Sequence, residues 1–149
     1  MIGHQGYGFV RDDSGNKTRI PHLGGVIIGS HVEIGCLSVI QSGTIISTII
    51  EDYAKIGDHV HLGHNDRVAR GASITGGVII AGSAVIGAEA WIGINSSIKD
   101  GRQVGDHALV GMDSSVQHDL ADYTVTRAPQ PDVRIRSDDD PATIGFKQR

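Results

Sequence analysis

The chain has 149 residues, a formal net charge of -4 and a pI near 6.0. The length fits one domain, and the acidic balance argues against nucleic acid or an anionic membrane as the main partner. Glycine occurs 21 times while aromatic residues make up only 4% of the chain, which favours a thin repetitive structure over a conventional globular core.

The N-terminal part predicts two strands and a loop. Residues 6–20, GYGFVRDDSGNKTRI, have the pattern of strands flanking a turn at residues 12–16. Ile28, Ile34 and Ile40 then follow at intervals of six, but the next aliphatic residue of the series, Ile50, comes ten positions after Ile40. Four extra residues within GTIISTII should therefore bulge out as a loop.

A period of six dominates the sequence from residue 50 onward. It matches neither the helix at 3.6 nor a plain strand at two, but it fits a short strand followed by a sharp turn, with glycine easing the corner. Three hexads would close a triangular coil of about 18 residues, stacked about 4.8 Å from the next by parallel hydrogen bonds. We therefore predict an all-β fold, a parallel β-helix of hexapeptide repeats over residues 1–130. Every sixth position is aliphatic: Ile50, Ile56, Leu62, Val68, Ile74, Ile80, Ile86, Ile92, Ile98, Val104, Val110 and Val116.

A second column of small residues lies four positions after the aliphatic one, and Asp66 and Arg102 break it. They stand two coils apart with Ala84 between them. Because an unpaired charge inside so narrow a coil would be very costly, we expect the two side chains to pair. The alternative is that the coil is locally distorted and both turn out to solvent, or that Arg102 faces a ligand.

Residues 131–149 are polar and include the run Ser-Asp-Asp-Asp-Pro at 137–141. This composition predicts a poorly ordered C-terminal tail, or one short helix beginning near Pro141. Cys36 is the single cysteine, so no internal disulfide forms, and a reducing cytoplasm is the expected location. No apolar run approaches the roughly 20 residues of a membrane span, and the N-terminus lacks the apolar segment of a signal peptide.

From about Gly6 to Arg134 the chain contains the motifs GYGFV, RIPHLGGVIIGSHVEIG, the loop around GTIISTII, GHN at 63–65, GGVIIAGS at 76–83 and PQP at 129–131. Together these motifs resemble the UDP-3-O-acylglucosamine N-acyltransferases of lipid A synthesis. The resemblance implies a left-handed β-helix, a homotrimer, and transfer of an acyl group from a pantetheine thioester to the amine of a nucleotide-linked amino sugar. The uridine-binding domain that precedes the β-helix in that family has no counterpart here, so another glycan pathway is an equal expectation.

The resemblance also implies roles for individual residues. It puts the general base on His64 and the amide that stabilises the oxyanion on Gly82, one coil away in the column that continues through Asp100 and His118. The family's second histidine would fall at Gly101, so Asp100 or a neighbouring subunit is expected to orient the base. Asn65, Asp66 and Arg102 are expected to support the site.

The acyl donor would be acyl-CoA or an acyl carrier protein, and no covalently bound cofactor is expected. Arg127 and Arg134 are candidates to hold the phosphates of coenzyme A, and Met112 is a candidate to limit the acyl chain length. The acidic run that follows these arginines makes acyl carrier protein the less favoured donor.

Two other functions stay open. The γ-class carbonic anhydrases share this fold and trimer and need three histidines around zinc, for which His59, His61 and His64 are candidates. A non-catalytic β-helix trimer is the second. The thin prism should rely on self-association for stability, and three outward positions are candidates for the subunit interface or a ligand: Ile79, Trp91 and Leu109.

Overall fold

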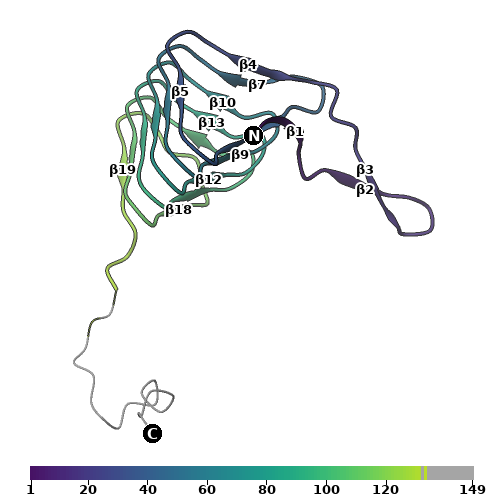
Figure 1. The fold of residues 1–149 in the computed structure, drawn as a ribbon. Helices are drawn as coiled ribbons and strands as arrows, with labels where there is room; N and C mark the ends of the chain where they lie inside the picture. Colours follow the sequence, from purple (N-terminus) through teal and green to yellow (C-terminus); the bar gives the residue numbers. More distant parts are fainter. Residues whose placement is uncertain (132, 134–149) are drawn as a thin grey trace, which may run out of the picture.

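The computed structural model describes residues 1–131 and 133, and these form a stack of triangular coils with one hairpin projecting from its side (Figure 1). The strands of successive coils align into three parallel sheets. The first sheet has the order β1 (Ile2–Gln5), β6 (Val39–Ser42), β9 (His61–Leu62), β12 (Ile79–Ile80), β15 (Ser97–Ile98), β18 (Ser115–Val116). The second has the order β4 (Val26–Ile28), β7 (Thr48–Ile50), β10 (Arg67–Val68), β13 (Val85–Ile86), β16 (Gln103–Val104). The third has the order β5 (Glu33–Ile34), β8 (Lys55–Ile56), β11 (Ser73–Ile74), β14 (Trp91–Ile92), β17 (Leu109–Val110), β19 (Val125–Thr126).

The register confirms a coil of three hexads. Ile80 pairs with Ile98, 18 residues further on. Across the interrupted coil Ile40 pairs with Leu62, 22 residues further on, because residues 43–47 leave the coil as a loop whose Ile45 and Ile46 are 83% and 72% exposed. The four extra residues are thus a surface loop, as predicted.

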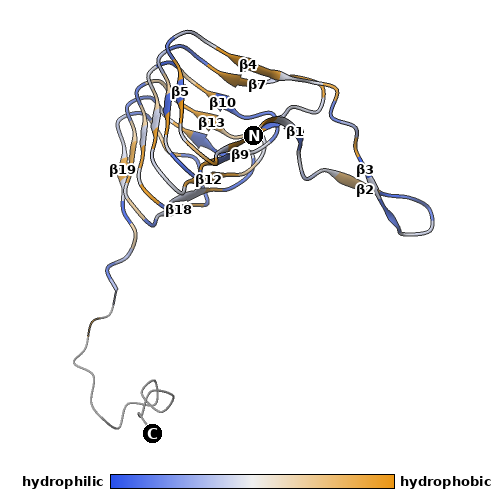
Figure 2. Cartoon of the chain, in the orientation of Figure 1, coloured by the Kyte–Doolittle hydropathy of each residue, from blue (hydrophilic) through white to orange (hydrophobic). Residues whose placement is uncertain are grey.

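The predicted aliphatic column is the core of the molecule. All twelve of its residues from Ile50 to Val116 are at most 3% exposed, and Figure 2 shows the hydrophobic colouring concentrated along the strands. Each such side chain contributes about 1.5–3 kcal/mol by burial. Ile28 belongs to the same series but is 39% exposed, because it lies in the first coil of the stack.

Glycine eases the corners, as predicted, mainly by letting neighbouring coils approach closely. The turn positions with positive φ are mostly occupied by other residues, eleven in the described chain, including Asn65 and Ser83, both at φ 64°. The glycines that follow the aliphatic column instead let two coils approach closely. A Cβ on Gly63 would lie 2.5 Å from the backbone nitrogen of Gly82 in the next coil.

The projecting hairpin consists of β2 (Phe9–Arg11) and β3 (Lys17–Arg19), paired antiparallel. Its turn is closed by the Asp12 carboxylate, which accepts hydrogen bonds from the backbone N–H groups of Ser14 and Asn16 at 3.0 and 2.9 Å. Two strands around a turn at residues 12–16 were predicted, and this is confirmed. The described residues contain no helix long and apolar enough to cross a membrane, and the tail predicted after Pro131 lies almost entirely outside them.

Candidate functional site

His64 lies at the corner between the first and second sheets, directly after β9 and Gly63. It is half-buried and lines a pocket of about 510 Å³. The pocket brings three predicted site residues together, since His64, Gly82 and Asp100 all border it. Its wall also includes Tyr7, Gln41, His61, Ile79 and Gly101.

Asn65 fixes the tautomer of the His64 ring. The Asn65 Nδ2 donates to the Ile46 carbonyl at 2.7 Å, so its Oδ1 is the acceptor end of the amide. That Oδ1 lies 2.9 Å from Nδ1 of His64, which requires Nδ1 to carry the proton. The Nε2 atom of His64 is therefore left with a free lone pair, as a general base needs.

The surface loop at residues 43–47 holds Asn65 in place. Thr44 donates its backbone N–H and its hydroxyl to Asn65 Oδ1 at 3.3 and 3.1 Å, and Ile46 accepts from the other end of the same amide. Just after the loop, the Thr48 hydroxyl accepts from the Asn65 backbone N–H at 2.9 Å. The insertion that interrupts the repeat thus supports the candidate base through Asn65.

The His64 ring is packed against two glycines from distant parts of the chain. A Cβ on Gly82 would lie 2.7 Å from His64 Nε2, and a Cβ on Gly6 would lie 2.8 Å from His64 Cδ2. Real Cβ atoms do not come so close, so both positions depend on glycine. The Gly82 backbone therefore lies directly beside the atom that would accept a proton.

His22 is a second histidine at this site, and sequence analysis assigned it no role. It is 8% exposed, and its ring meets the His64 ring edge-on with centroids 5.5 Å apart. Its Nδ1 lies 2.9 Å from the Ile20 carbonyl, whereas its Nε2 is buried without a hydrogen-bond partner among the described residues. The sequence signal for His22 was its place in the motif RIPHLGG. The residue lies near His64 only because the chain runs back from the hairpin to the stack.

The Gly82 N–H is the candidate oxyanion donor. At the equivalent turn position in two other coils, an aspartate of the next coil accepts the backbone N–H. Ala88 donates to Asp106 at 2.7 Å, and Cys36 donates to Asp58 at 2.6 Å. Asp100 holds the corresponding place above Gly82, yet within the described chain the Gly82 N–H makes no hydrogen bond. It remains available to a ligand in the pocket.

The predicted pairing of Asp66 with Arg102 is wrong. Asp66 does point into the coil and is 1% exposed, but the Arg102 guanidinium lies 3.5 Å from Asp119 at the surface. An arginine turned outward keeps its hydration and a carboxylate partner, whereas inside the coil most of its donors would be unsatisfied. Without a cation, burial raises the pKa of the Asp66 carboxyl to about 8, opposed by the hydrogen bond from the Ala84 N–H.

The three histidines considered for zinc lie on different parts of the coil. His59 is a turn residue at φ 56° in the corner between the third and first sheets, and His61 faces outward from β9 into the pocket. Burial lowers the pKa of His61. Residues 1–131 and 133 contain no group of three or more His, Cys, Asp or Glu side chains placed to share a metal ion.

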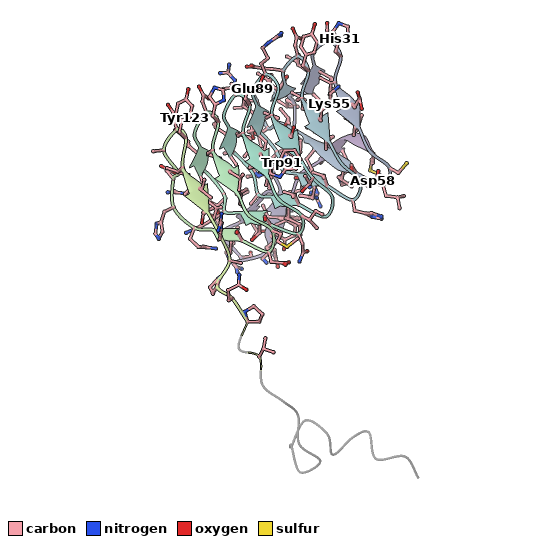
Figure 3. The ribbon with its side chains drawn as sticks, turned by 90° about the vertical axis from the view of Figure 1, so that its left-hand side faces the viewer. His31, Lys55, Asp58, Glu89, Trp91 and Tyr123 are labelled. Atoms are coloured by element: carbon pink, nitrogen blue, oxygen red, sulfur yellow. The ribbon has the colours of Figure 1, made fainter. Side chains whose placement is uncertain are left out.

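The predicted donor-binding residues Met112 and Arg127 line a second pocket, of about 520 Å³. An apolar pocket of about 290 Å³ adjoins it and includes Trp91 and Leu109. Figure 3 shows Trp91 on the face of the third sheet, between the edge that carries His31, Glu89 and Tyr123 and the edge that carries Asp58. Arg134 lies outside the described residues. Neither of these pockets shares a residue with the His64 pocket.

Known proteins resemble this chain in sequence over part of its length and in fold over most of it. No family model matches the chain. A UDP-3-O-acylglucosamine N-acyltransferase 2 from Legionella pneumophila (strain Lens) is 49% identical over 59 residues, and a Coxiella burnetii (strain Dugway 5J108-111) UDP-3-O-acylglucosamine N-acyltransferase is 42% identical over 60. The chain resembles this family over those residues. They amount to 40% of this chain and only 17% and 18% of the two relatives.

Solved structures confirm the left-handed β-helix fold. The UDP-N-acetylglucosamine acyltransferase from Campylobacter jejuni matches with a TM-score of 0.71 at 22% identity, over 83% of this chain and 46% of that one. PerB from Caulobacter crescentus, solved with CoA and GDP-perosamine, matches with a TM-score of 0.56 at 20% identity, over 69% of this chain and 51% of that one.

Proposed function

We propose that this protein is an N-acyltransferase that moves an acyl group from a pantetheine thioester to the amine of a nucleotide-linked amino sugar. The observation that carries the proposal is the arrangement of His64 between Asn65 and Gly82. Asn65 leaves the His64 Nε2 free to accept a proton. The Gly82 backbone lies beside this atom, and its N–H makes no hydrogen bond within the described residues.

The geometry supports the following steps. His64 Nε2 takes a proton as the amine nitrogen attacks the thioester carbonyl carbon and forms the new C–N bond. The Gly82 N–H donates to the oxyanion that develops on that carbonyl oxygen. When the intermediate collapses, the C–S bond breaks, and the protonated His64 returns its proton to the leaving thiolate. The products are an amide and a free thiol.

Coenzyme A is the proposed form of the donor. The relatives named above act on UDP-linked glucosamine derivatives, and structures of the same fold were solved with CoA and GDP-perosamine or with acetyl coenzyme A. Arg127 would supply a charge-assisted contact to a phosphate, and the neighbouring apolar pocket at Trp91 and Leu109 would hold the pantetheine arm. This pocket shares no residue with that of His64, and we propose that a donor seated there serves the His64 of an adjacent subunit. The proposal therefore includes a homotrimer.

We also propose a reducing cellular compartment for this protein. Cys36 is an exposed free thiol, and free thiols persist under reducing conditions. We place the enzyme in the cytoplasm.

A donor and acceptor screen tests the reaction class. The purified protein is incubated with acetyl-CoA, longer acyl-CoAs or acyl carrier protein thioesters and with UDP- or dTDP-linked amino sugars, and amide products are followed by mass spectrometry. We expect an acylated nucleotide sugar with at least one acyl-CoA. Turnover with acyl carrier protein alone would contradict the coenzyme A assignment, and no amide from any pair would contradict the reaction.

A further inference from the structure

The inner column, four positions after the aliphatic column, contains three serines: Ser38, Ser96 and Ser114. Two of their hydroxyls accept a backbone N–H from the column residue one coil further: Val60 donates to Ser38 Oγ at 3.0 Å and Ser114 to Ser96 Oγ at 3.3 Å. Each of these two hydroxyls also donates to a backbone carbonyl three residues earlier in that coil, Gly57 O at 2.8 Å and Gly111 O at 2.9 Å. In these two places the hydroxyl of the inner column accepts one hydrogen bond and donates another, whereas the Ser114 hydroxyl has no partner among the described residues.

Asp66 occupies the same column and makes the first of these two bonds. The Ala84 N–H donates to Asp66 Oδ1 at 2.9 Å. The other oxygen, Oδ2, is buried and has no hydrogen-bond partner among the described residues. The two donating serines reach the carbonyl of the residue directly after the aliphatic column, since Gly57 follows Ile56 and Gly111 follows Val110. The equivalent carbonyl for Asp66 is that of Ala81, which follows Ile80.

The peptide that joins Ala81 to Gly82 has one end in the core and one in the pocket. At equivalent turns the carbonyl is reached by an inner-column hydroxyl, as at Gly57, while the following N–H reaches a surface carboxylate, as at Ala88. The Ala81 carbonyl is thus on the Asp66 side, and the Gly82 N–H is on the His64 side.

We propose that Asp66 is a positioning residue that stays protonated and donates its carboxyl O–H to the Ala81 carbonyl, which holds and polarises the peptide that presents the Gly82 N–H to the substrate. Only a protonated carboxyl can supply the donor that the serines supply in their coils. The raised pKa of Asp66 agrees with this form at neutral pH. Its role in turnover rests on the proposed acyl transfer, because it acts through Gly82.

No cation in the surroundings opposes the neutral form. Arg102 stands in the same column but turns outward to Asp119, and the neighbouring Arg67 side chain is exposed and pairs with Glu51. His64 belongs to the same turn and faces the pocket and Asn65. Within the described residues no ion pair involves Asp66.

The chain offers matched variants for the test. Asp66→Ser restores the hydroxyl that the column uses elsewhere, and Asp66→Ala supplies the residue found at position 84 but no donor. Both residue types occur in this column, so both variants should fold. We expect Asp66→Ser to keep kcat within about threefold of the wild type and Asp66→Ala to lower it by about tenfold or more, with KM for the donor unchanged in both. Equal kcat losses in the two variants would overturn the proposal.

A spectroscopic measurement decides the proposal even without turnover. In protein labelled with ¹³C, the Asp66 carboxyl should show the chemical shift of a protonated acid at pH 7, and the Ala81 carbonyl shift should move in Asp66→Ala but stay in place in Asp66→Ser. An Asp66 carboxyl that titrates near pH 4, or an Ala81 carbonyl that ignores both substitutions, would refute it. If these shifts behave as expected while no acyl transfer occurs, only the proposed function fails.

Discussion

The Oδ1 atom of Asn65 lies 2.9 Å from Nδ1 of His64. The other end of the Asn65 amide is committed to the Ile46 carbonyl, so this contact assigns the proton of the imidazole to Nδ1. The loop that interrupts the six-residue repeat packs beside Asn65 and holds it by hydrogen bonds. An irregularity of the sequence is thus linked to the chemistry of the candidate base.

Removing the Asn65 side chain should weaken the base without straining the backbone at position 65. Asn65→Gly tolerates the observed φ of 64° but leaves Nδ1 of His64 without its acceptor. We expect kcat to fall by about tenfold to a hundredfold, less than for loss of the base itself. Asn95→Gly is the control, since Asn95 has φ 59° at another corner and donates to Asp113. Equal activity of the two variants, measured by product formation, would argue against the orienting role.

A methyl group at position 82 should displace the His64 ring. The added Cβ of Gly82→Ala would lie 2.7 Å from His64 Nε2, so the ring must move by a substantial fraction of an ångström. Because displacements near 1 Å cost about 10²-fold in rate, we expect a loss of that order in kcat. Gly76→Ala is the matched control, at the same turn position one corner earlier, where the nearest atom to the new Cβ is 3.4 Å away. Similar kinetics for both variants would contradict the contact.

Asp66 should make the fold less stable as the pH rises. Its pKa is about 8 in the folded chain against 3.8 for an unperturbed aspartate, so between these values the folded state binds the additional proton. The free energy of unfolding therefore falls with pH, by up to about 1.4 kcal/mol per pH unit. The lowered pKa of His61 acts in the opposite direction but only below about pH 6.5, so urea unfolding between pH 6.5 and 8 isolates Asp66. Asp66→Ser should remove this slope, and a wild-type slope equal to that of Asp66→Ser would contradict the buried neutral acid.

The outward apolar residues predict self-association. Ile79, Trp91 and Leu109 are 55%, 50% and 40% exposed in the single chain, which confirms their predicted outward position. Burying them between subunits would add apolar contact that the thin coil lacks. Analytical ultracentrifugation at micromolar concentration should give three times the mass of one chain. A stable monomer would contradict the trimer and, with it, a donor site shared between subunits.

The sequence predicted the parts of the fold that depend on the repeat. Ile50 to Val116 are buried because the six-residue period turns every sixth side chain toward the inside of the coil. The ten-residue step before Ile50 does not fit this period, so four residues had to leave the coil as a loop. Gly82 could be aligned with His64 for the same reason, since residues 18 apart occupy one corner.

The repeat could not predict contacts made by segments outside it, or the direction of a long side chain. His22 and Gly6 reach His64 only because the hairpin returns to the stack, and no periodicity encodes that return. Asp66 and Arg102 occupy equivalent positions, but solvation separates them. The Arg102 guanidinium turns out to Asp119, whereas the Asp66 carboxyl stays inside, where burial raises its pKa to about 8.

The most direct test of the account compares the wild type with His64→Ala and His118→Ala. His118 lies in the same column of the corner but outside the described pocket. With an acyl-CoA and an amino-sugar nucleotide as substrates, free thiol and amide should appear in equal amounts in the wild type and in His118→Ala. In His64→Ala the rate should be about 10²–10⁴ lower, with an unchanged midpoint of thermal unfolding. Amide formation by His64→Ala at the wild-type rate would contradict the assignment of His64 as the general base.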